Sequence, residues 1–151
     1  MPSFRIETPI AAPISACFDA ARSVDAHLAS MSRSGERAVA GVTSGLLTFG
    51  DAVTWEARHL GIRFRMTATI TILEAPHRFV DEQVAGPFDA WWHEHTFAER
   101  PGGVTLMTDD VRFRSPLGPL GAVVDRLVLT RYLHRLIDAR AQWLRSTLEA
   151  S

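Results

Sequence analysis

The chain has 151 residues, of which 46% are hydrophobic and 22% are charged, and its formal net charge is −1. A chain of this length and composition can bury a sizeable core, so we expect one folded domain over residues 1–151 and exclude a disordered protein. The near balance of charges argues against a nucleic-acid-binding protein, because such proteins usually carry a marked basic excess.

Few features of the sequence bear on the compartment. The single cysteine, Cys17, cannot form an intrachain disulfide, which fits a reducing environment. The first residues lack the charged start and apolar run of a secretory signal peptide. No apolar stretch approaches the roughly 20 residues that cross a bilayer. We therefore expect a cytoplasmic protein without an integral membrane segment.

The first part of the chain predicts a strand, two short helices and another short strand. Residues 3–10 alternate between apolar and polar side chains, as a half-buried strand does. Pro13 suits the first turn of a helix, and Ser23 is a candidate N-cap for a second helix that ends near residue 30. A loop then leads to a short strand over 37–42.

Five further strands follow, separated by turns that contain glycine or proline. The clearest runs from Ile62 to Leu73, where one face is apolar and the other carries arginine and threonine. The phase of the next strand, over 78–85, is ambiguous in the sequence. The remaining strands are predicted over 51–59, 88–98 and 104–114.

The region after Pro119 predicts a long helix up to Glu149, because it contains no further proline. From Leu129 onward its apolar side chains share one broad face. The apolar side chains of the preceding segment point in another direction: Leu120, Val123, Val124 and Leu127. One straight helix cannot bury both faces on the same sheet, so we expect a kink or a separate helix near Leu129 and Thr130. We expect the earlier segment to pack against the two N-terminal helices; a cap at a cavity mouth, a homodimer contact and a membrane contact are the alternatives.

One charged residue, Arg140, falls on the apolar face of this helix. A buried guanidinium without a partner is energetically costly. One interpretation is a structural ion pair with a strand carboxylate, or a side chain that reaches out to water. The other is an anchor for an acidic or carbonyl group of a ligand. The candidate carboxylates are Asp81, Glu82, Asp109 and Asp110.

The strand FDAWWHEHTF places Trp91, His93, His95 and Phe97 on one face. The two histidines could line an apolar pocket, where imidazoles orient a ligand or act as catalytic acids and bases. They could equally be inert, hydrogen-bonded side chains.

A third interpretation of the same histidines is joint metal binding, but a lone pair of histidines two residues apart is a weak signal. The only obvious further ligands are His59 and the Asp109–Asp110 pair, of which at most one carboxylate faces inward. We therefore expect no metal and no cofactor.

The order of these elements, and several stretches of the sequence, resemble the START-like (SRPBCC) superfamily with its helix-grip fold. The stretches are ETPIAAPISACFDAARSVDAHLAS, GDAVTWEARHLG, HRFVDEQVAGPFDAWWHEHTF and GGVTLMTDDVRFRSPLGPLG, and the last three are similar to the polyketide cyclase/dehydrase-like, ligand-binding branch. The resemblance implies an α+β fold in which a curved antiparallel sheet wraps around a long C-terminal helix, with two short helices after the first strand. It also implies a cavity that holds lipids, hormones or polyketides. The helical histidine pair and carboxylate that hold iron in the Rieske oxygenases of this superfamily do not occur in this chain.

We predict a protein that binds a small hydrophobic molecule in a cavity between the sheet and the C-terminal helix. The predicted polar groups of the cavity are His93, His95 and Arg140. Its predicted apolar walls are Trp55, Phe64, Met66, Ile70, Trp91, Phe97, Leu133, Leu136 and Ile137. The alternative is a cyclase or dehydratase that acts on an aromatic or polyketide-like substrate, with His93 or His95 as the acid–base catalyst.

Overall fold

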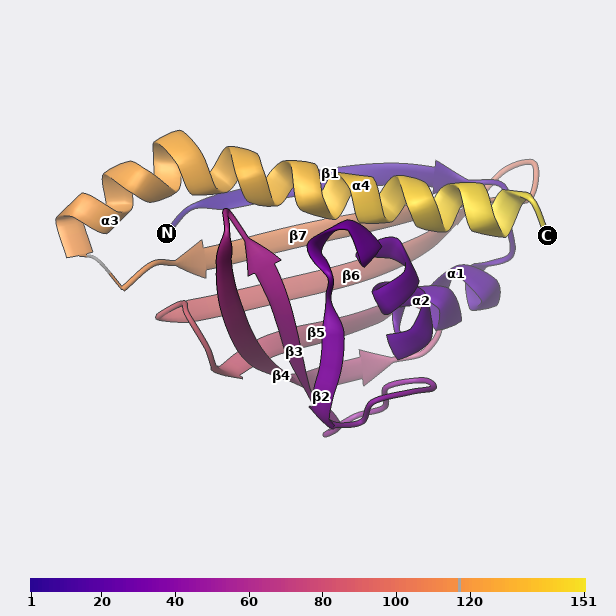
Figure 1. Cartoon of the computed structure of the whole chain (residues 1–151). Coiled ribbons are helices and arrows are strands. Elements are labelled where there is room, and N and C mark those ends of the chain that lie inside the picture. Colours follow the sequence, from indigo (N-terminus) through magenta and orange to yellow (C-terminus); the bar gives the residue numbers. More distant parts are fainter. Residues whose placement is uncertain (117) are drawn as a thin grey trace.

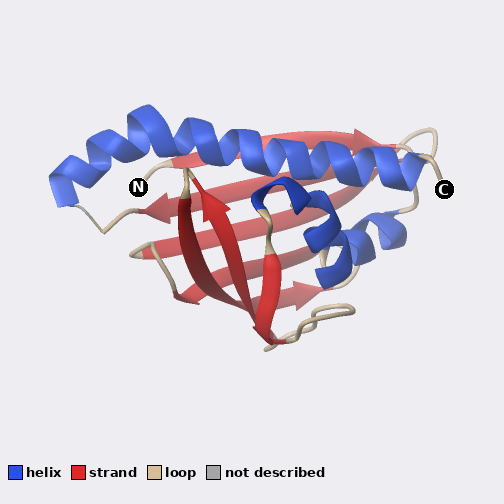
Figure 2. Ribbon diagram, viewed as in Figure 1, coloured by secondary structure: helices blue, strands red, loops and turns tan. Residues whose placement is uncertain are grey.

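A curved antiparallel sheet wraps around one face of a long C-terminal helix in the computed structural model (Figures 1 and 2). The structure describes residues 1–116 and 118–151, without the side chains at positions 122 and 124–126. The seven strands lie in the order β1-β7-β6-β5-β4-β3-β2. They are β1 (Ser3–Ile10), β2 (Arg37–Gly41), β3 (Ala52–His59), β4 (Ile62–Glu74), β5 (Arg78–Ala85), β6 (Ala90–Arg100) and β7 (Val104–Arg114).

Two short helices follow β1, as the sequence predicts, and the predicted α+β helix-grip architecture is confirmed. Ser23 caps the second of them, since its hydroxyl accepts a hydrogen bond from the backbone N–H of Ala26 at 3.1 Å. The helical segments are α1 (Ile14–Ala21), α2 (Val24–Ser30), the 3₁₀ turn η1 (Ser32–Ser34), α3 (Gly118–Val124), the π-helical segment η2 (Asp125–Leu129) and α4 (Thr130–Glu149).

The predicted break in the C-terminal helix is confirmed by η2, which separates α3 from α4 near Leu129. The expectation that the earlier segment packs against α1 and α2 is wrong. Leu120, Val123 and Leu127 are 69%, 53% and 67% exposed, and Figure 1 shows α3 at the opposite end of the molecule from α1 and α2. The physical reason is length, because α4 alone spans the sheet and carries α3 beyond its edge. The side chain of Val124 lies outside the described residues.

The pleat of the sheet decides which side chains point inward. In β6 the burial pattern alternates strictly, so Trp91, His93 and His95 all face α4. In β7 the predicted alternation of the two acidic residues holds. Asp109 is buried, whereas Asp110 lies on the outer face and pairs with Arg5 at 2.9 Å.

The interior is packed solidly at the end covered by α1. Phe18 projects from α1 between the rings of Phe79 and Phe97, with centroid separations of 5.6 and 5.5 Å. Cys17 is fully buried in the same cluster and acts as a small core residue. None of the helices in the described part of the chain is long and apolar enough to cross a bilayer.

Candidate functional site

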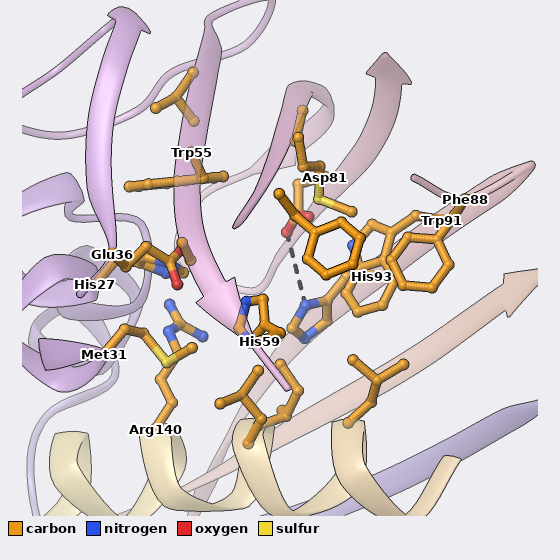
Figure 3. A pocket seen from close by; sticks show the side chains of 18 of the residues that line it. His27, Met31, Glu36, Trp55, His59, Asp81, Phe88, Trp91, His93 and Arg140 are labelled. Carbon is orange, nitrogen blue, oxygen red and sulfur yellow. Dashed lines mark hydrogen bonds and ion pairs between the residues drawn. The ribbon is translucent and has the colours of Figure 1, made fainter. Parts of the chain in front are cut away.

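A cavity of about 400 Å³ lies between the sheet and α4. Its walls come from α2, from strands β3 to β6 and from α4, as Figure 3 shows from close by. The cavity exists because α1 and its phenylalanine fill only one end of the space under the helix. The sheet curves away from α4 elsewhere and leaves the space between them open.

The predicted apolar walls border this cavity with one exception. The residues that do so are Trp55, Phe64, Met66, Ile70, Trp91, Leu133, Leu136 and Ile137. Phe97 does not, although it faces inward as predicted. Its ring packs against Phe18 and Phe79 in the solid core, because it lies nearer the end of the sheet that α1 covers.

The predicted polar groups His93, His95 and Arg140 also border the cavity. They are joined by residues that sequence reasoning did not assign to it. Glu36 follows η1, and its carboxylate lies 2.5 Å from His27 Nε2. Other additions include Met31, His59, Asp81, Phe88 and Tyr132. For His59 the signal was present, because it shares a face of its strand with Trp55.

Two histidines and two aspartates form a buried cluster at the sheet side of the cavity. His93 Nε2 hydrogen-bonds to Asp109 Oδ1 and His95 Nε2 to Asp81 Oδ2, both at 2.8 Å. The other ring nitrogens lie farther from the opposite carboxylates. His93 Nδ1 is 3.9 Å from Asp81 Oδ2, and His95 Nδ1 is 3.3 Å from Asp109 Oδ1. The two imidazoles stack with their centroids 3.8 Å apart.

The electrostatics of this cluster keep its carboxylates ionised. Burial by itself raises the pKa of Asp81, but the hydrogen bond from His95 and the positive potential of both imidazoles hold it at about 2. Burial likewise opposes ionisation of Asp109, and hydrogen bonds from both histidines lower its pKa far below the usual range.

The two imidazoles are shifted in opposite directions. Burial and the neighbouring His95 lower the pKa of His93. Burial acts the same way on His95, but its hydrogen bonds to Asp109 and Asp81 outweigh that cost and raise its pKa. The cluster therefore favours its proton on His95.

Arg140 enters the cavity from α4 and makes no ion pair with a described residue. Its Nη2 donates to the carbonyl oxygen of Ala21 at 2.6 Å, which anchors it to the end of α1. Its Nε is buried without a hydrogen-bond partner among the described residues. The predicted ion pair with a strand carboxylate is therefore wrong. Figure 3 shows the guanidinium group pointing from α4 toward Glu36, with open cavity beside it.

A second polar contact joins the sheet to α4. His59 Nδ1 and the hydroxyl of Tyr132 are 2.8 Å apart, so β3 and the helix are linked across the cavity. Burial lowers the pKa of His59 and raises that of Tyr132, because both charged forms lose hydration there.

No protein-family model matches the chain, and no curated protein matches it in sequence. Solved structures do match it over nearly its whole length. TTHA0849 from Thermus thermophilus has a TM-score of 0.79 at 16% identity, covering 99% of this chain and 98% of that one. A START superfamily protein from Mycobacterium smegmatis has a TM-score of 0.73 at 12% identity, covering 98% and 97%. The ginseng major latex-like protein 151 has a TM-score of 0.70 at 13% identity, covering 97% of both chains. The chain thus has the helix-grip fold of START superfamily structures.

Proposed function

We propose that residues 1–151 act as one domain that binds a small hydrophobic molecule in the cavity between the sheet and α4. The observation that carries this proposal is the cavity itself. Its volume of about 400 Å³ lies in the range of small-molecule sites, which are roughly 300–1,000 Å³. Its walls are mostly apolar and aromatic, with a few polar groups at defined places, as such sites require. The START superfamily neighbour shares the fold that encloses the space.

The polar groups suggest what the ligand carries. Arg140 offers N–H groups to the cavity, but Glu36 and Asp81 also border it. Arg22 also borders the cavity, but its guanidinium already donates hydrogen bonds to Asp19 and to a backbone carbonyl oxygen. It is therefore less available than Arg140 to a ligand. A ligand carboxylate next to Arg140 would therefore meet two protein carboxylates nearby. We propose a neutral acceptor, such as a carbonyl oxygen, as the group that Arg140 binds.

The alternative of a cyclase or dehydratase is favoured by one observation. His93 and His95 face the cavity and belong to a coupled, buried cluster of the kind that transfers protons near neutral pH. His93 Nδ1 is the relevant atom, because it lies 3.9 Å from Asp81, beyond hydrogen-bond distance. We propose ligand binding as the general function and proton transfer as the chemistry that this cluster could add.

The binding proposal is tested with Nile red, a neutral dye that has a carbonyl group and fluoresces in apolar surroundings. We expect saturable binding to the purified protein. Replacing Trp91→Ala removes a cavity wall and should weaken the dye about tenfold, which corresponds to about 1.4 kcal/mol.

The matched control is Trp92→Ala. Trp92 neighbours Trp91 but lies on the outer face of β6, where it packs against Arg112 with a separation of 4.6 Å from guanidinium to ring. Its replacement should leave dye affinity unchanged. Absence of saturable binding, or equal loss in both variants, contradicts a ligand site in this cavity.

A further inference from the structure

The cluster of histidines and aspartates contains a set of donor atoms that sequence reasoning did not bring together. We propose that Asp81, His93 and His95 bind a divalent transition-metal ion at the wall of the cavity. The sequence alone offers only His59 and the Asp109–Asp110 pair as further ligands, and on that basis no metal is expected. The fold instead delivers Asp81 from β5, whose register places it opposite His93 on β6.

The distances suit one ion. One donor atom from each of Asp81, His93 and His95 lies within 4.8 Å of the other two. His95 Nε2 is already 2.8 Å from Asp81 Oδ2, and His93 Nδ1 is 3.9 Å from the same oxygen. Metal–ligand bonds of about 2.0–2.2 Å put neighbouring donors roughly 3.3–3.6 Å apart in a tetrahedral site. The donors therefore need shifts of only about 1 Å, and Figure 3 shows Asp81 and His93 facing each other at the cavity wall.

The second aspartate orients the two imidazoles for this task. Asp109 lies behind them, with Oδ1 at 2.8 Å from His93 Nε2 and 3.3 Å from His95 Nδ1. Each ring thus turns one nitrogen to Asp109 and the other toward Asp81. A carboxylate behind a ligating histidine is the usual outer-shell partner in metal sites, where it fixes the ring and its tautomer. Asp109 is 1% exposed, so this position is rigidly held.

A further feature points to a cation. The cluster contains two carboxylates, and neither has an arginine or lysine within 4.0 Å among the described residues. A divalent ion supplies the missing positive charge.

The donor set selects the kind of metal. Two imidazoles and one carboxylate suit zinc, iron, cobalt or nickel, whereas magnesium and calcium prefer oxygen donors alone. Three protein ligands leave coordination positions open, and these face the cavity because Asp81, His93 and His95 all border it. A carbonyl oxygen of a bound molecule could occupy one of them. The metal proposal does not depend on the ligand proposal, since the three side chains are preassembled without it.

The test is calorimetric titration of tag-free, chelator-treated protein with Zn²⁺, together with the visible absorption of the Co²⁺ form. We expect about one ion per chain and intense Co²⁺ bands typical of nitrogen ligation at low coordination number. Asp81→Asn and His93→Gln should each weaken Zn²⁺ binding by at least about tenfold, since even outer-shell changes cost about 10–100-fold. His77→Ala, at an exposed histidine, should leave it unchanged.

Three results would overturn the proposal: no stoichiometric ion in the wild type, variants that bind as tightly as the wild type, or loss of binding in His77→Ala. Circular dichroism establishes that each variant is folded. If a variant fails to fold, the NMR resonances of the histidine rings in the wild-type Co²⁺ form provide the test. The proposal requires paramagnetic shifts on two buried rings, and an unshifted spectrum would contradict it. Nile red titration of the metal-free protein tests ligand binding separately. Dye binding without metal binding would overturn the metal proposal and leave the ligand proposal standing.

Discussion

Arg140 is a charged residue in an unusual environment. It is 5% exposed, and its one described hydrogen bond goes to the carbonyl oxygen of Ala21. Burying a charge with an unsatisfied Nε destabilises the fold, and an apolar residue of similar length avoids that penalty. Because the guanidinium costs stability and borders the cavity, we propose that it is kept for ligand binding.

Replacing Arg140→Met should therefore separate stability from binding. We expect the free energy of unfolding to stay the same or rise by about 1 kcal/mol, because a buried charge is removed. We expect Nile red to bind about tenfold more weakly, because a hydrogen bond from a charged donor contributes about 1.5–3 kcal/mol. Urea unfolding and dye titration measure the two quantities.

Arg135→Met is the control, since Arg135 lies on α4 with its side chain exposed to solvent. It should change neither quantity appreciably. A large loss of stability in Arg140→Met, with dye affinity preserved, would show that the guanidinium has a structural role and no part in binding.

His59 gives the molecule a predictable response to acid. Burial lowers its pKa below the ordinary value of 6.5, so the unfolded chain takes up the proton first as pH falls. The contribution of His59 to stability is complete above pH 6.5 and declines as the pH drops below it. Relative to a His59→Gln variant, the wild type should thus lose stability between pH 6.5 and its lowered folded pKa.

Urea unfolding of both proteins at a series of pH values measures this difference. His77→Gln serves as the control for the loss of a histidine, because His77 is exposed on the surface. Parallel profiles for wild type and His59→Gln would contradict the burial of the imidazole.

At the scale of elements, α1 divides the interior into a solid end and a hollow end. Phe18 is 1% exposed and packs against two phenylalanines, so Phe18→Ala should lower the free energy of unfolding by about 3–5 kcal/mol. Trp91 borders an existing cavity, so one side of its ring faces open space rather than packed side chains, and we expect Trp91→Ala to cost about half as much. Equal losses in urea unfolding would mean that the cavity wall is packed as tightly as the core.

The sequence predicts elements well where alternation or capping is strong. The strand over 62–73 and the cap at Ser23 match the structure closely, because each depends on neighbouring residues alone. Asp81 was missed as a cavity residue because the phase of its strand is ambiguous in the sequence. Pairing with β6 fixes that phase, and pairing is a long-range property.

The C-terminal helix shows the same limit. Its break near Leu129 follows from two apolar faces that cannot share one surface, and η2 occurs there. Whether Leu120 and Leu127 are buried depends on where α3 lies relative to the sheet. The helical pattern of the sequence does not predict that position. The partner of Arg140 was unpredictable for a similar reason, since a backbone carbonyl leaves no signature in the sequence.

At the scale of the whole molecule, the cavity follows from how the sheet closes. β1 forms one edge of the sheet and pairs with β7, and the strand order then runs continuously to β2 at the other edge. The sheet bends around α4 as it runs, and α1 with α2 closes one end of the enclosed space (Figure 1). Antiparallel pairing of β5 with β6 sets Asp81 beside the histidines, so one wall of the cavity carries both apolar surface and the histidine–aspartate cluster.

Native mass spectrometry of the protein purified from its own host shows whether a small molecule occupies the cavity. We expect a population that carries one small apolar molecule, retained in Trp92→Ala and lost in Trp91→Ala, because of these two residues Trp91 borders the cavity. A spectrum with the unliganded mass alone, or an adduct that persists equally in both variants, would contradict this expectation.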